Sequence, residues 1–295
     1  MKLAVNYSHP AAELLRMGKI QVDCFKCPAW PDLVATVQDM YPVYVHFPLK
    51  VGLGIGDAVD AETGQPADWD KVETLLSQTG TPLVNLHLAP STRDYPDIPV
   101  DTVDPVHIEM LTERMIKDID GVVERFGAER VVVENDHGSR GRHLRPAFLP
   151  DVICRVVQET GCGLLLDLSH ARLAAHHLEL NAREYIQALP TAYVREIHIT
   201  GIQRFEGRWV DLAQRVGVEA DVVQHFAGQL IDHLPMTEED WKFATWSMEL
   251  AHSGAWGQPW IVTFEYGGVS ALYQAVTDVD VLAEQIPRLY TLVKE

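Results

Sequence analysis

The sequence of 295 residues is 47% hydrophobic and carries a formal net charge of −18. Such an acidic chain repels phosphate backbones, so an extended nucleic-acid footprint is not expected. No apolar run approaches the roughly 18 residues that a membrane-spanning helix needs, and the amino terminus is a poor signal peptide. We therefore expect a soluble, cytoplasmic protein.

Eight short apolar segments are expected to form strands, and helical periodicity marks most of the segments between them. Several strands are apolar without interruption, which is typical of parallel strands buried on both faces. The expected strands are Leu3–Tyr7, Ile20–Cys24, Pro42–Phe47, Pro82–Leu88, Arg130–Glu134, Gly163–Leu168, Val194–Thr200 and Trp260–Tyr266. The expected helices are Ala11–Gly18, Pro31–Met40, Trp69–Gln78, Val106–Phe126, Pro146–Glu159, Ala171–Ala188 and Val269–Val293. This alternation predicts one α/β domain over residues 1–295, a (β/α)8 TIM barrel, with a doubly wound open sheet as the rival fold.

Two connections are longer than simple turns. Lys50–Ala67 is rich in Gly and Asp, and Gly201–Leu230 follows the seventh strand. Long connections in a barrel usually belong to its functional rim. The spacing Gly52-x-Gly54-x-Gly56 opens no clear helix, so we interpret it as a flexible rim loop rather than a phosphate cradle.

Six successive strands end in His, Asp or Glu. The carboxyl ends of barrel strands converge on one rim, and burying such groups is costly unless each finds a partner. A cluster of cations would satisfy them together, and mixed imidazole and carboxylate ligands suit Fe, Mn, Zn or Co. Each residue alone could instead be a structural histidine, a helix cap or an ion-pair partner. The predicted metal ligands at these ends are His46, His87, Glu134, Asp167, His170, His198 and Glu265.

Two members of this set, Asp167 and His170, lie at a strand-to-helix turn, where Asp167 could also act as the helix N-cap. Two further residues add to the set. Asp232 and His233 are predicted ligands in the segment IDHLPMTEEDW, in which Thr237 is expected to cap a helix. Asp211 lies nearer to His198 in the sequence and is the alternative to Asp232.

Cys24 and Cys27 form a C-x-x-C pair at the expected end of the second strand, on the same rim. Such a pair could bind a metal, form a redox pair or accept an oxidised substrate sulfur. The simpler interpretation, which we favour, is two reduced and partly buried thiols.

The segment TGCGLLLDLSHARLAAHHLELNAREYIQALPTAYVREIHITG resembles the corresponding part of the bacterial multinuclear non-haem iron-dependent oxidases. That family lies within the xylose-isomerase-like TIM barrels, together with sugar isomerases and apurinic endonucleases. Shorter similarities follow in the same order: His46 with VGLGIGD, then NLHLAP, VVVEND, EIHITG and FEY. The resemblance therefore extends over most of the chain.

The resemblance implies two or three metal ions, iron first and Mn or Zn as alternatives. It places all nine predicted ligands at matching positions, and it implies oxygen activation and oxidation of a small or peptide substrate, often a cysteine of a peptide that a partner protein presents. Two departures leave the metal number and the substrate open. Asp167-Leu168-Ser169-His170 replaces the usual Asp-Val-Asn-Asn, and Asp232 and His233 are adjacent instead of forming Asp-x-His.

Three enzyme classes stay open from the residues. The first is the iron-dependent oxidoreductase. The second is a sugar or sugar-phosphate isomerase or epimerase with one divalent metal, in which Glu134 and Glu265 are the catalytic residues that move a proton between two faces of the substrate. The third is a hydrolase like the endonucleases, which the negative charge disfavours. A barrel that binds metal without catalysis is the non-enzymatic alternative.

Overall fold

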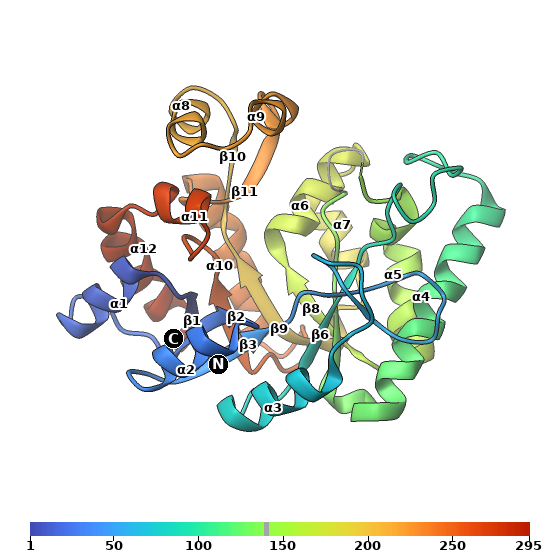
Figure 1. Ribbon diagram of the computed structural model, residues 1–295, viewed down its shortest axis with the longest axis horizontal. Coiled ribbons are helices and arrows are strands. Elements are labelled where there is room, and N and C mark those ends of the chain that lie inside the picture. Colours follow the sequence, from blue (N-terminus) through green and yellow to red (C-terminus); the bar gives the residue numbers. More distant parts are fainter. Residues whose placement is uncertain (139–141) are drawn as a thin grey trace.

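Eight parallel strands form the barrel of this protein (Figure 1). The structure is a computed structural model that describes residues 1–138 and 142–295. These strands are β1 Lys2–Asn6, β2 Cys24–Pro28, β3 Val43–His46, β6 Val84–Leu88, β7 Val131–Glu134, β8 Gly163–Asp167, β9 Val194–Ile199 and β12 Ile261–Phe264. They neighbour one another in the order β3-β2-β1-β12-β9-β8-β7-β6. A doubly wound sheet would reverse its order in the middle, whereas this order runs once around the ring.

The third barrel strand is interrupted, and the ring closes through it. β3 pairs with β2, whereas β4 (Leu49–Val51) pairs in parallel with β6, and only Phe47 and Pro48 separate β3 from β4. At the break, the Asn85 side chain replaces backbone pairing: it accepts from Phe47 N at 2.7 Å and donates to Phe47 O at 2.9 Å. The predicted TIM barrel is therefore confirmed.

The helices lie outside the strands and cover the barrel (Figure 1). They are α1 His9–Arg16, α2 Pro31–Gln38, α3 Trp69–Thr79, α4 Pro105–Phe126, α5 Pro150–Thr160, α6 Leu168–His177, α7 Ala182–Ala188, α8 Arg208–Arg215, α9 Ala220–Phe226, α10 Glu238–His252, α11 Ala271–Val276 and α12 Val279–Lys294. Two expected helices are each divided in two, because the N-caps Asn181 and Asp278 start new helices inside them. Thr237 caps α10 with a full capping box, as predicted. None of the described helices combines the length and the apolar character that crossing a bilayer requires.

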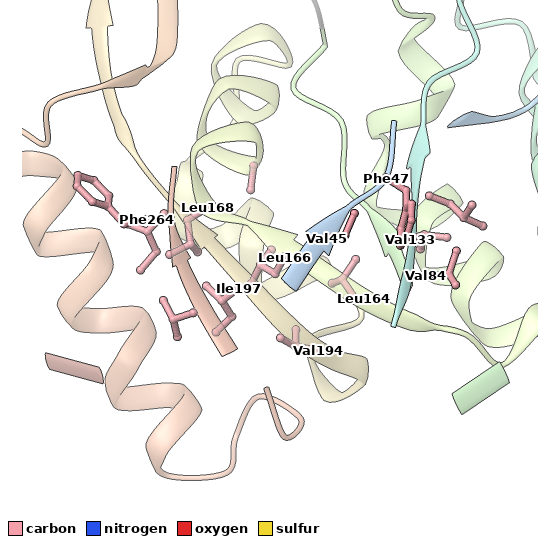
Figure 2. Close-up of a cluster of buried hydrophobic side chains, with 14 of the residues drawn as sticks. Val45, Phe47, Val84, Val133, Leu164, Leu166, Leu168, Val194, Ile197 and Phe264 are labelled. Carbon is pink, nitrogen blue, oxygen red and sulfur yellow. The ribbon is translucent and has the colours of Figure 1, made fainter. Parts of the chain in front are cut away.

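The core follows the alternation of side chains along each strand. Figure 2 shows one cluster, in which Leu164 and Leu166 of β8 lie near Val133 of β7 and Ile197 of β9. These side chains belong to the main hydrophobic cluster, which also includes residues of the surrounding helices. The intervening positions, such as Leu165, belong to a smaller cluster between the strands. Towards the carboxyl ends of the strands the inward positions become polar.

The glycine-rich connection is held in place by a carboxylate of the chain, so the expectation of a flexible loop was wrong. Gly52, Leu53 and Gly54 donate their backbone N–H groups to one oxygen of Asp118 on α4, and Gly56 donates to the other, at 2.7–2.9 Å. A carboxylate on α4 thus occupies the position that a phosphate would take in a cradle.

The second long connection has its own structure. β10 (Gly201–Arg204) and β11 (Leu230–Leu234) pair antiparallel, and α8 and α9 lie between them in the sequence. These elements rise beyond the rim of the barrel (Figure 1). They enclose a separate small hydrophobic cluster that contains Trp209.

The second strand begins four residues later than the sequence pattern predicts. Ile20–Cys24 was the expected strand, whereas β2 runs from Cys24 to Pro28. The apolar residues Ile20 and Val22 instead pack into the main core from the connection before β2. This shift moves Cys24 to the amino end of the strand and places Lys26 near the rim.

The two cysteines therefore do not form a chelating pair at the rim, and that placement was wrong. Residues three apart in a strand face opposite sides, and Cys24 packs with Ala4 and Tyr44 while Cys27 packs in the main core. Burial raises the pKa of both thiols to about 12. They are neutral thiols, in agreement with the simpler interpretation of the motif.

Candidate metal centre

All nine predicted ligands converge at the carboxyl rim of the barrel. They come from the ends of six strands, from the first turn of α6 and from β11. Four sets of three side chains each have donor atoms that all lie within 4.8 Å of one another. These sets are His46, Glu134 and His198; Glu134, Asp167 and His170; His137, His170 and Asp232; and Asp167, His198 and Glu265, which we call the Glu265 group. The sets share members, so they form one continuous cluster.

Glu134 lies at the middle of this cluster, at the end of β7. Its Oε2 faces one pair of histidines, with His87 Nδ1 at 3.2 Å and His46 Nε2 at 3.5 Å. Its Oε1 faces another pair, with His170 Nδ1 at 3.4 Å and His198 Nδ1 at 3.9 Å. Oε2 is buried and has no hydrogen-bond partner. A carboxylate placed in this way can bridge two cations.

Asp167 divides its two oxygens between structure and site. Oδ1 accepts the backbone N–H groups of Ser169 and His170 and so caps α6. Oδ2 is buried without a hydrogen-bond partner, 3.7 Å from His170 Nε2 and 4.0 Å from His198 Nδ1. The helix cap and the ligand position are therefore compatible, because each uses a different oxygen.

His198 is oriented by Glu196, which was not among the residues predicted from the sequence. Its Nε2 lies 2.9 Å from Oε1 of Glu196, which also accepts from the Tyr44 hydroxyl at 3.1 Å. The other Glu196 oxygen accepts from the Trp260 indole at 3.3 Å. A proton on His198 Nε2 leaves Nδ1 as a lone pair, and Nδ1 is buried with no hydrogen-bond partner. A carboxylate behind a ligating imidazole is the usual arrangement around protein-bound metals.

The other histidines are oriented by backbone carbonyls. His170 Nδ1 lies 3.0 Å from the carbonyl of Asn135, which leaves Nε2 to face Asp232 Oδ2 at 3.2 Å. His233 Nδ1 lies 2.8 Å from the carbonyl of Glu265. His233 has a φ of 57°, which a non-glycine residue rarely adopts. This conformation lets the adjacent Asp232 and His233 both face the site, although neighbours in a regular strand point to opposite sides.

The pKa shifts of several residues in the cluster are those expected of a site that binds a cation. Burial lowers the pKa of His46 and His198 well below the ordinary value, so both rings are neutral and able to ligate. Burial raises the pKa of the Glu134 carboxyl to about 8. A carboxylate with so high a pKa is poorly compensated by the protein alone. Buried ligand atoms without partners and a nitrogen–oxygen donor set both fit a bound transition metal.

Some predicted residues lie beside the four sets instead of within them. His87 contacts Glu134 and lies 3.3 Å from His46, and His233 Nε2 is 4.0 Å from Glu265 Oε2. Asp211 is exposed on α8 and belongs to none of the four sets.

The structure adds His137, Lys26 and the Glu196–Tyr44 pair to the site. His137 follows β7 and joins His170 and Asp232. Lys26 contacts Glu265. Strand alternation could have found Glu196 and Tyr44, because each lies two residues before a predicted ligand histidine and so shares its face.

Two cavities open onto the cluster, and His87, Glu134 and His170 line both. The larger, of about 600 Å³, has Lys50, Arg93 and Arg142 among its walls. The other, of about 360 Å³, is bounded largely by apolar and aromatic side chains, among them Tyr7, Trp30 and Tyr273. Two cavities therefore give access to the predicted ligands.

Residues 26–250 match the family model described as RiPP precursor modification enzyme MbnB/TglH/ChrH. A UPF0276 protein of Rhizobium meliloti is 28% identical over 172 residues, which are 56% of this chain and 51% of that protein. A UPF0276 protein of Bordetella pertussis is 44% identical over 52 residues, 18% of each chain. The chain thus spans about half the length, or less, of these two curated relatives.

Two solved structures resemble the fold over nearly the whole chain. D-psicose 3-epimerase from Clostridium cellulolyticum H10 has a TM-score of 0.51 at 12% identity, covering 100% of this chain and 98% of that one. D-allulose 3-epimerase from Methylomonas sp. has a TM-score of 0.52 at 12% identity, covering 99% and 96%. At this identity the likeness shows the fold alone, a TIM barrel.

Proposed function

Because the chain belongs to the family of RiPP precursor modification enzymes described as MbnB/TglH/ChrH, we propose that it is a multinuclear iron enzyme that oxidises a small or peptide substrate at cysteine. The observation that carries this proposal is the position of Glu134, whose two oxygens face two different pairs of histidines. A carboxylate shared in this way favours at least two cations over one. The mixed nitrogen and oxygen ligands favour iron, with Mn and Zn as alternatives.

The nine predicted ligands, together with His137, would hold two or three metal ions. Bound iron would supply the one-electron chemistry with O2 that protein side chains lack. The chain itself keeps His46 and His198 neutral, orients the ligand imidazoles through Glu196 and backbone carbonyls, and buries one oxygen each of Glu134 and Asp167. It also leaves two cavities through which a thiol can approach.

We also propose that the substrate is delivered as part of a peptide, with a partner protein as its carrier. The two cavities support this proposal, because both reach the cluster at His87, Glu134 and His170 and together offer room for an extended chain.

Spectroscopy on anaerobically purified, iron-loaded protein tests the proposal. Mössbauer and EPR spectra should show at least two magnetically coupled irons per chain. Mass spectrometry of a cysteine peptide incubated with the protein and O2 should show a mass change that needs both iron and O2. A single uncoupled iron, or an unchanged peptide with its carrier present, would contradict the proposal.

A divalent-metal sugar isomerase or epimerase is the second candidate. Glu134 ends β7 and Glu265 follows β12, and both face His198 Nδ1, at 3.9 and 3.1 Å. Two carboxylates on separate strands could move a proton between two faces of a substrate. Exchange of solvent deuterium into a ketose, catalysed by protein that holds one Mn or Co, would favour this candidate over the oxidase.

A further inference from the structure

A lysine side chain lies among the ligands of the candidate metal centre. Lys26 occupies the third position of β2, and its side chain is 10% exposed. Its ammonium contacts Oε1 of Glu265, which lies at the end of the last barrel strand. The cluster of carboxylates therefore already contains one cation that belongs to the protein.

The ammonium and a metal ion would compete for the same oxygen. Oε1 of Glu265 lies 3.1 Å from His198 Nδ1, and both residues belong to the Glu265 group, which would hold a metal ion. Two cations on one oxygen in a poorly solvated site repel each other strongly. Metal binding at this group would therefore separate Lys26 from Glu265.

The displaced ammonium has space to move, and the other buried carboxylate that lines this cavity, Glu134, belongs to the ligand sets and would itself be held by metal ions. Lys26 lines the cavity of about 360 Å³ and is the one Lys or Arg among the described residues that do so. Glu62 also lines it but is exposed, so water and salt screen its charge. A buried ammonium without an anion is costly. The flexible stem of lysine allows the short movement that is required.

We propose that Lys26 binds a carboxylate group of the substrate in this cavity once a metal ion holds Glu265. This inference rests on the metal centre of the proposed function and adds the chemical class of the substrate. The apolar part of such a substrate would contact Tyr7 and Trp30, and Trp30 is 44% exposed at the cavity. Asn6 pairs with Lys26 in the strand register and also lines this cavity.

The two binding events are coupled through one side chain. In metal-free protein Lys26 is held by Glu265, so a carboxylate ligand must break that ion pair. In metal-loaded protein the ion pair is already broken, and the same ligand binds more tightly. Linkage requires the reverse as well: the carboxylate ligand must tighten metal binding by the same factor.

Calorimetric titration with benzoate tests the inference without any redox step. Zinc, which is redox-inert, is loaded into wild-type protein, Lys26→Met and Lys26→Arg, and metal analysis first establishes the zinc content of each. Lys19→Met is the matched control, because it removes one exposed lysine charge. Benzamide serves as the uncharged probe of the same shape.

Zinc-loaded wild type, Lys26→Arg and Lys19→Met should bind benzoate at least tenfold more tightly than Lys26→Met, and benzamide should not distinguish them. Metal-free wild type should bind benzoate at least tenfold more weakly than the zinc-loaded form. Equal benzoate affinity in zinc-loaded wild type and Lys26→Met would overturn the role of Lys26 and leave the metal centre intact. Equal affinity with and without zinc would overturn it even if Lys26→Met fails to fold. Wild type that takes up neither zinc nor iron would overturn the metal centre itself.

Discussion

Two buried carboxylate sites of this barrel differ in how their oxygens are satisfied. Asp118 on α4 is fully buried and accepts four backbone N–H groups from the glycine-rich connection. Glu134 and Asp167, at the rim, are equally buried but each keeps one oxygen without a hydrogen bond. The comparison separates a carboxylate that holds the fold together from carboxylates that are placed to bind cations.

Buried carboxylates therefore have two different roles in this chain. At Asp118 the protein supplies all the donors, and the result is a fixed loop. At the rim Glu134 and Asp167 each keep a buried oxygen without a donor, and His46 and His198 are neutral, so the set needs more positive charge than Lys26 supplies. The predictions below test this contrast, from the largest expected effect to the smallest.

Metal removal should have the largest effect. A ligand present at 1,000 times its dissociation constant stabilises the folded state by about 4 kcal/mol for each site. Chelation should therefore lower the free energy of unfolding of wild-type protein by at least about 4 kcal/mol, measured by urea denaturation with and without the chelator. Unchanged stability would mean that the rim carboxylates do not depend on cations.

Asp118→Asn should lower the free energy of unfolding by about 3 kcal/mol, because hydrogen bonds to a charged acceptor are lost and an amide N–H₂ meets backbone donors. Metal content should stay the same, since Asp118 belongs to none of the four ligand sets. Denaturation and metal analysis of one preparation measure both. Loss of metal in this variant would remove the distinction between the two kinds of carboxylate.

Glu196→Gln should weaken metal binding by about 10- to 100-fold, as expected for a group that orients a ligating histidine. The amide keeps the shape of the side chain but removes the charge behind His198. Competition with a fluorescent chelator gives the affinity, and Asp118→Asn is the control. An unchanged affinity would show that Glu196 has only a packing role.

Thr237→Ala should have the smallest effect, about 1 kcal/mol of stability, because it removes the capping box of α10. Metal content and affinity should not change. A thermal melt in the metal-free state isolates this contribution, and a change in metal affinity would indicate that α10 positions Asp232 and His233.

The sequence predicted the barrel and the ligands at its rim better than it predicted the residues that contact and orient those ligands. Uninterrupted apolar runs such as Leu164–Leu166 leave few alternatives to a buried parallel strand, and a polar residue that ends such a run must lie at the rim. This reasoning brought seven of the predicted ligands to one place, whereas Asp232 and His233 were predicted from a separate segment. The ligand roles themselves stay predictions until metal is measured.

What the sequence did not predict has identifiable physical causes. Lys26 was missed because the predicted second strand was placed too early in the sequence. Ile20 and Val22 are apolar like the residues of a buried strand, but they pack into the core from the connection before β2. Glu196 looked like the polar half of an alternating strand, because sequence does not distinguish the interior of a barrel from solvent. Asp118 resembled any acidic residue on a helix, since its partners are backbone amides more than 60 positions away.

Metal analysis of Glu134→Gln against wild type tests the central claim most directly, because Glu134 belongs to two of the four ligand sets. Wild-type protein purified anaerobically should contain at least two metal ions per chain, and Glu134→Gln should lose at least one while it stays folded. Equal metal content in the two proteins, or none in wild type, would contradict the account.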